Sequence, residues 1–294
     1  FSGKEIKFLD CFLVGLFAAF GFLSKYLFIY LLFSIDLLFI YLIFIKKERK
    51  FDFKYLITIE VFLVVLVPHL IWLYNNDFIT ITYGLARTGL EQSTLIEHIV
   101  FPLTFLLKQL GIIIPFLILI WLLVKNVKPK LNFKDKKLLF LFAINLLPIF
   151  LMFLTSLITG SKIRTMWMTP FYLFFGTFVV YLLKEQINLK KLKPFMIGIV
   201  FFFFLSPILY AYISISKDDK RTDYQGKEIA IKTQYAWDQQ FSSTINVVLG
   251  NEWNAGNLSY HLKSRPVWEG IVEREKLDQL KDFMCLDNIC VGSR

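Results

Sequence analysis

Long apolar stretches alternate with short polar connections over the first 215 residues of the chain. A helix needs about 20 mostly apolar residues to cross about 30 Å of hydrocarbon. The pattern therefore predicts about seven membrane-spanning helices, over residues 8–23, 26–45, 55–74, 101–124, 138–158, 169–183 and 195–215. The first two stretches are closely joined, which favours a tight hairpin between them.

The pattern changes after residue 215, where charged residues recur every few positions and the long apolar stretches stop. The spacing predicts helices over residues 227–241, 252–262 and 274–283 and a buried strand over residues 244–249. Alternating helices and strands are typical of an α/β unit. The predicted fold is thus an all-α polytopic membrane bundle, residues 1–215, followed by a small α/β extracytoplasmic domain, residues 216–294.

Composition supports a membrane protein, because 56% of the residues are hydrophobic and only 19% are charged. Average soluble domains are nearer a quarter charged. The polar surface is too small to cover a soluble globule of this size, which excludes a cytosolic enzyme, a nucleic-acid-binding module and a disordered chain.

The net charge of +10 comes largely from three connections between the predicted helices, residues 46–54, 125–137 and 184–193. The other connections carry only Arg87, and then Lys162 and Arg164. By the positive-inside rule the three basic connections face the cytoplasm. The sequence therefore predicts a multi-pass inner-membrane protein whose turn at Lys25, residues 75–98, residues 159–168 and C-terminal domain lie on the periplasmic face.

Two cysteines, Cys285 and Cys290, lie close together in the C-terminal domain. An extracytoplasmic location is oxidising, so a disulfide between them is one interpretation and two free thiols are the other. Cys11, in the first apolar stretch, is interpreted as a small core residue. The spacing of Cys and His predicts no metal site.

Ionisable residues inside predicted membrane helices are candidates for function, because burying charge in hydrocarbon is costly. Lys25, Asp36, Glu60 and Lys108 are of this kind. Lys25 lies at the first turn, where it is either a cation for a phosphate or a lysine that reaches the membrane surface. Asp36 and Glu60 are interpreted as buried groups that tie helices together, or as functional carboxylates.

The connections predicted to face the periplasm combine aromatic, amide and charged groups. A saccharide site could use His69, Trp72, Asn76, Asp77 and Tyr83, although aromatic residues also mark membrane interfaces. The cations Arg87, Lys162 and Arg164 suit a phosphate group, either on a substrate or on a lipid headgroup.

Four motifs resemble bacterial members of glycosyltransferase family 39, the dolichyl-phosphate-mannose-protein mannosyltransferase-like group. They are GFLSKY at residues 21–26, PHLIW with NNDF within residues 68–78, GSKIR at residues 160–164 and LGNEWNAGN at residues 249–257. The resemblance implies a GT-C membrane fold whose active site faces outward. The sequence itself indicates no cofactor. The resemblance also implies transfer of a hexosyl or pentosyl unit from a polyprenyl-phosphate carrier to a lipid or protein.

By the same resemblance Lys25 matches a lysine near the carrier phosphate, and Arg164 would be a second cation for it. Residues 75–89 match a mobile loop that covers the cavity. The acidic base of the family lies in a loop between its first two helices, and we expect that loop to precede the first helix of this sequence. We therefore expect a C-terminal portion of a longer protein, inactive alone, and we do not assign Asp77 as the base.

Two other function classes remain open from the sequence. Asp36 and Glu60 are compatible with a transporter or flippase for an envelope precursor, although no inverted repeat is visible. A non-catalytic membrane scaffold is the other. The sequence predicts no nucleic-acid partner, because basic residues do not cluster on one folded face.

Overall fold

The computed structural model describes residues 6–48, 51–88, 94–125, 127, 129, 131–216, 223–286 and 288–294. The chain divides into two compact units, Phe1–Phe204 and Leu205–Arg294. We call the first unit, together with the rest of the helix that crosses the division, the bundle. The division falls within the last long helix, ahead of the boundary expected at residue 215. Each unit is described by itself.

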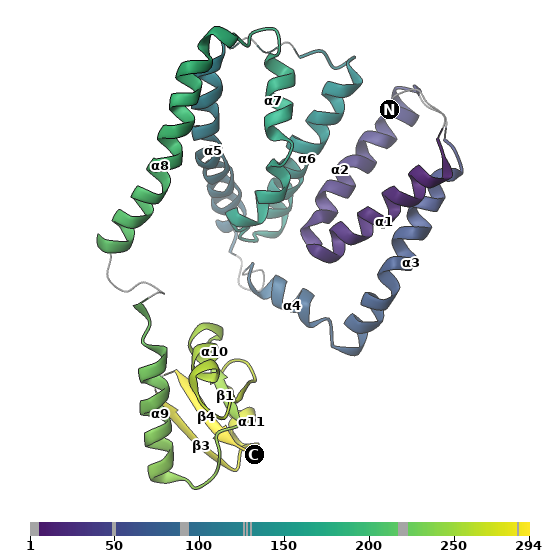
Figure 1. Cartoon of the computed structure of the whole chain (residues 1–294). Coiled ribbons are helices and arrows are strands. Elements are labelled where there is room, and N and C mark those ends of the chain that lie inside the picture. Colours follow the sequence, from purple (N-terminus) through teal and green to yellow (C-terminus); the bar gives the residue numbers. More distant parts are fainter. Residues whose placement is uncertain are drawn as a thin grey trace. The chain divides into compact units, whose positions relative to one another are not determined.

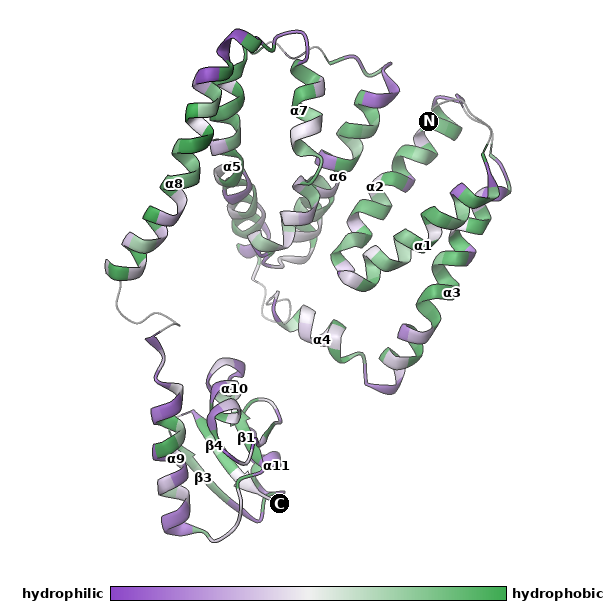
Figure 2. Ribbon diagram, in the orientation of Figure 1, coloured by the Kyte–Doolittle hydropathy of each residue, from purple (hydrophilic) through white to green (hydrophobic). Residues whose placement is uncertain are grey.

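The bundle is helical throughout, apart from its connections (Figure 1). Its elements are α1 (Phe8–Ser24), η1 (Tyr26–Phe28), α2 (Ile29–Ile40), η2 (Tyr41–Ile45), α3 (Lys54–Asn75), α4 (Ile79–Ala86), α5 (Glu97–Leu123), α6 (Lys136–Thr159), η4 (Thr165–Tyr172), α7 (Phe175–Leu183), η5 (Leu189–Lys191) and α8 (Leu192–Ser216). Apolar residues cover most of the long helices (Figure 2).

Within the described residues, five helical stretches are long and apolar enough to cross a membrane: Tyr26–Ile45, Lys54–Asn75, Glu97–Leu123, Lys136–Thr159 and Leu189–Ser216. A sixth is present if η4 and α7, bent by 55°, form one span. The predicted polytopic helical bundle is thus confirmed. The expected seven spans require that the shorter α1, with 17 residues, is counted too.

The three basic connections contact one another at one end of the bundle, which we call the basic end. Lys136 forms an ion pair with Glu48 at 2.8 Å and joins the first connection to the second. The backbone N–H of Lys125 donates to the carbonyl of Gln186 at 3.1 Å and joins the second to the third. The hydrogen bond from Lys136 lowers the pKa of Glu48.

The second unit contains what we call the tail domain, residues 223–294. Its elements are α9 (Gly226–Gln240), β1 (Val247–Gly250), α10 (Glu252–His261), β2 (Val267–Trp268), α11 (Arg274–Leu277), β3 (Asp282–Leu286) and β4 (Ile289–Ser293). The strands form one sheet in the order β2-β1-β4-β3, parallel only between β1 and β2. Helices α9 and α10 were predicted, and β1 lies in the predicted strand region.

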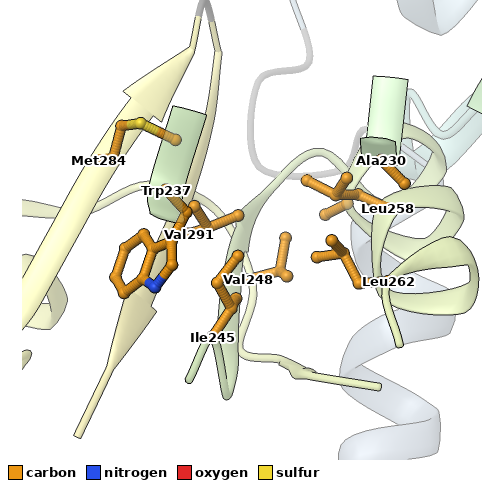
Figure 3. Packing of buried hydrophobic residues seen from close by; sticks show 9 residues of the cluster. Ala230, Trp237, Ile245, Val248, Leu258, Leu262, Met284 and Val291 are labelled. Atoms are coloured by element: carbon orange, nitrogen blue, oxygen red, sulfur yellow. The ribbon is translucent and has the colours of Figure 1, made fainter. Parts of the chain in front are cut away.

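The core of the tail domain forms where the sheet meets α9 and α10 (Figure 3). Trp237, Ile245 and Val248 are completely buried. The indole Nε1 of Trp237 donates to the carbonyl of Ser243 at 2.6 Å. That bond satisfies the polar atom of a buried ring, as burial of Trp requires.

The prediction of a helix over residues 274–283 was wrong for the second half of that range. Helix α11 ends at Leu277, and residues 282–286 form strand β3 instead. Every residue of β3 pairs with β4, which was also not predicted. Pairing between strands overrides local helix propensity here, because strand preference depends on the neighbouring strand more than on the local sequence.

Candidate functional site

Lys25 lies in the tight turn that joins α1 to η1. Gly21 permits this turn, because a Cβ atom there would lie 2.5 Å from the ring of Phe28. The backbone N–H of Lys25 donates to the carbonyl of Gly21 at 3.1 Å. Its side-chain Nζ donates to the carbonyl of Trp167 at 3.2 Å. The GFLSKY motif therefore places a cation against η4, 142 residues further along the chain.

Tyr26 joins three elements beside this lysine. Its hydroxyl lies 2.7 Å from Nε2 of His69 on α3 and 2.8 Å from Oγ1 of Thr80 on α4. The ring of His69 stacks on the ring of Trp72, with centroids 5.8 Å apart and an interplanar angle of 12°. Tyr26 and Thr80 were not singled out from the sequence. The polar side chain of Tyr26 within GFLSKY was the sequence feature that could have indicated this contact.

The chain reverses between α3 and α4 at Asp77 and Phe78. Both residues have positive φ, 49° and 53°, a conformation uncommon for residues other than glycine. The side-chain amide of Asn76 donates to the carbonyl of Trp72 at 2.8 Å and helps to end α3. The predicted covering loop, residues 75–89, thus contains the helix α4, and Gly89 lies outside the described residues.

The GSKIR segment packs against the end of α4. Gly160 ends α6 in the left-handed conformation with φ 66°, and Ser156 Oγ donates to the carbonyl of Ser161 at 2.7 Å. The backbone N–H of Lys162 then donates to the carbonyl of Thr88 at 2.9 Å. This bond joins a cation-bearing loop to the residue that follows Arg87.

The four predicted phosphate-binding cations therefore lie on segments that contact each other at one end of the bundle, which we call the Lys25 end. The guanidinium of Arg87 lies 4.9 Å from the ring centre of Tyr83, and Lys162 Nζ lies 5.9 Å from that of Phe101. Arg164 directly precedes η4, and its residue is partly buried. These side chains carry positive charge on neighbouring segments, with aromatic rings beside two of them.

The charged residues within the helices are not buried, although burial between helices was one expectation for Asp36 and Glu60. Asp36 on α2, Glu60 on α3 and Lys108 on α5 are all exposed. A polar group that is buried is the neighbouring Gln109, 3% exposed, whose side-chain oxygen accepts a hydrogen bond from Tyr172 at 2.5 Å. Its Nε2 has no partner in the described part of the chain.

The predicted cysteine pair lies in the tail domain, where Cys285 and Cys290 form a disulfide. The two residues face each other in the register of β3 and β4. Cys11 is buried on α1, as a small core residue would be. Among the residues that the structure describes, no group of three His, Cys, Asp or Glu side chains could hold a metal ion.

Comparison with known proteins gives one match. No curated protein and no solved structure is matched. The match is to the family model described as dolichyl-phosphate-mannose-protein mannosyltransferase, over residues 4–72. This range contains α1, α2, nearly all of α3, and both Lys25 and His69. The predicted resemblance is therefore confirmed: this part of the chain is similar to the dolichyl-phosphate-mannose-protein mannosyltransferase family.

Proposed function

We propose that the chain is part of a membrane glycosyltransferase that takes a sugar from a polyprenyl-phosphate carrier. The sugar, a hexosyl or pentosyl unit, passes to a lipid or protein acceptor on the periplasmic face of the inner membrane. One observation carries the proposal. Lys25, inside the matched range, donates a hydrogen bond into η4, directly beyond the loop that carries Lys162 and Arg164.

The chemistry requires positive charge at this position. Transfer breaks the bond between the anomeric carbon and a phosphate oxygen, and it forms a bond from that carbon to the acceptor oxygen. Negative charge grows on the leaving phosphate, and cations held in place beforehand stabilise that charge. The acceptor proton must pass to a base. We assign no described residue to that role.

The location suits a donor that is anchored in lipid. The polyprenyl chain would remain between helices while its phosphate reaches the Lys25 end, where helices give way to polar loops. Tyr26 follows Lys25 in the sequence, and its hydroxyl lies 2.7 Å from Nε2 of His69. The ring of His69 in turn stacks on the ring of Trp72. We assign these three groups to the sugar. No contact of the described residues favours the transporter.

The proposal is tested by the affinity for a polyprenyl phosphate of the full chain in lipid nanodiscs, measured by native mass spectrometry. We expect Lys25→Met to weaken binding about 10- to 100-fold, since it removes a charged partner of the phosphate. Lys162→Met should weaken binding in the same direction. Lys190→Met, an exposed lysine at the basic end, is the matched control and should bind like the wild type.

Lys25→Arg keeps the positive charge and should retain binding. It therefore distinguishes loss of the charge from a folding defect. Equal affinity of the wild type and Lys25→Met for the polyprenyl phosphate would refute the proposal. Equal affinity of the wild type for the neutral polyprenol and for the phosphate would also refute it.

A further inference from the structure

The tail domain contains a cavity of about 430 Å³ between α9, α10 and the hairpin of β3 and β4. We propose that this cavity is a binding site for a neutral saccharide unit. The volume falls in the range of small-molecule sites in proteins, about 300–1,000 Å³. The proposal concerns the tail domain alone and does not depend on sugar transfer at the Lys25 end.

The floor of the cavity is part of the core of the tail domain. Leu258, Met284 and Val291 line it and also belong to the buried cluster in Figure 3. Side chains that are packed into a core keep their positions, so the apolar floor exists before a ligand binds. Such a floor can cover the C–H face of a sugar ring.

The walls are held in place by two close contacts. The disulfide between Cys285 and Cys290 closes the hairpin, whose neighbouring residues Leu286 and Ile289 line the cavity. At the other wall, a Cβ atom on Gly226 would lie 2.8 Å from the ring of His261, so α9 approaches the end of α10 closely there. The cavity is therefore bounded by fixed elements on both sides.

The polar lining groups select the class of ligand. Asn254 and Asn288 offer amides that both donate and accept, as sugar hydroxyls do, and Tyr224 adds a phenol. Burial raises the pKa of the Tyr224 phenol, so it stays protonated and able to donate.

Every described lining side chain is uncharged. A charged ligand would lose its hydration and find no counter-charge among these described side chains, and a purely apolar ligand would leave the amides unpaired. A neutral ligand with hydroxyls and an apolar face satisfies both requirements.

Methionine methyl NMR on the full chain in lipid nanodiscs tests this site directly. The chain has five methionines, and Met284 alone lies in the tail domain, where it lines the cavity. Titration with methyl mannoside should move the Met284 signal in a saturable way and leave the other four signals in place. Methyl glucuronoside, which is charged, and cyclohexanol, which is apolar, should bind at least about tenfold more weakly.

Two variants localise the effect to the cavity. Asn254→Ala should weaken methyl mannoside binding about tenfold, as loss of a hydrogen-bonding partner predicts. Asn257→Ala, a matched change on the same helix outside the cavity lining, should have no effect. A shift of the Met284 signal in Asn254→Ala before ligand is added would show that this variant alters the cavity itself. Asn288→Ala is then the variant to test.

An unmoved Met284 signal up to the solubility limit of the glycoside would overturn the proposal. A signal that responds equally to cyclohexanol or to the acidic glycoside would overturn it as well. Binding should persist in Lys25→Met, since that residue belongs to the bundle. Failure of the carrier-phosphate test is therefore distinguishable from failure of this one.

Discussion

Individual hydrogen bonds join segments that lie far apart in the sequence, in the tail domain as in the bundle. Asp282 at the start of β3 is an example. Its Oδ2 accepts from Ser243 Oγ at 2.6 Å and from Ser293 Oγ at 3.1 Å. The hydrogen bond from Ser243 lowers the pKa of Asp282 below its ordinary value of 3.8. The carboxylate thus connects β3 to the segment before β1 and to β4.

The lowered pKa predicts how the tail domain responds to pH. Because the pKa of Asp282 is lower in the folded state than its ordinary value of 3.8, the ionised carboxylate stabilises the fold above pH 3.8. This stabilisation is lost as the pH falls through the lower pKa of the folded state. Asp282→Asn should therefore lower the unfolding temperature, followed by the Met284 methyl signal, at neutral pH. The difference from the wild type should shrink below about pH 4. A difference that is constant with pH would contradict this, and Asp278→Asn, exposed beyond α11, is the control.

At the scale of elements, α1 and α3 pack through small residues. The buried residues of α1 are Cys11, Gly15 and Ala19, spaced four apart on one face. A Cβ atom on Gly15 would lie 2.5 Å from the carbonyl oxygen of Thr58, and Thr58 Oγ1 donates to the carbonyl of Cys11 at 3.1 Å. Small residues let membrane helices approach closely, so this face sets the distance between the two helices.

Gly15→Ala should destabilise the bundle, because the added methyl meets backbone that must move. We expect a loss of about 1–3 kcal/mol in the free energy of unfolding, typical of an overpacked contact. Gly84→Ala on α4 is the matched control, since nothing lies within 4 Å of the added atom. Equal unfolding midpoints in mild detergent for the two variants would show that the α1–α3 contact is looser than described.

At the scale of the bundle, the connections sort into two ends. The basic connections meet through the contacts of Glu48 with Lys136 and of Lys125 with Gln186. At the Lys25 end, Lys25 contacts Trp167 and Lys162 contacts Thr88. This sorting matches the alternation of charge along the sequence. It supports the proposal that the basic end is cytoplasmic and the Lys25 end periplasmic.

Labelling of single cysteines in intact cells checks this orientation. In a Cys11→Ser background, Lys162→Cys should react with a membrane-impermeant maleimide added from outside. Lys190→Cys, exposed at the basic end, should react only after the membrane is permeabilised. The native Cys285 and Cys290 are joined in a disulfide and should stay unlabelled. Labelling of Lys190→Cys alone in intact cells would reverse the proposed orientation.

The sequence by itself determined the helical stretches, their apolar character and the placement of basic residues. These are local properties, since the thickness of the hydrocarbon and the length of an apolar run are enough to define a span. Each of the seven apolar stretches predicted in the first 215 residues is largely helical in the structure. The motif around Lys25 likewise resembled a known family from residues next to each other, and the family match includes it.

Only the tertiary structure decided which polar groups meet. Tyr26 contacts His69 and Thr80, which lie 43 and 54 residues further along the chain. The partner of Lys25 lies 142 residues further along. Strand β3, whose first two residues were expected to end a helix, exists because β4 pairs with it. The tail cavity likewise needs two helices and a hairpin at once. Contacts between segments so distant depend on how the chain packs, which no local pattern of residues contains.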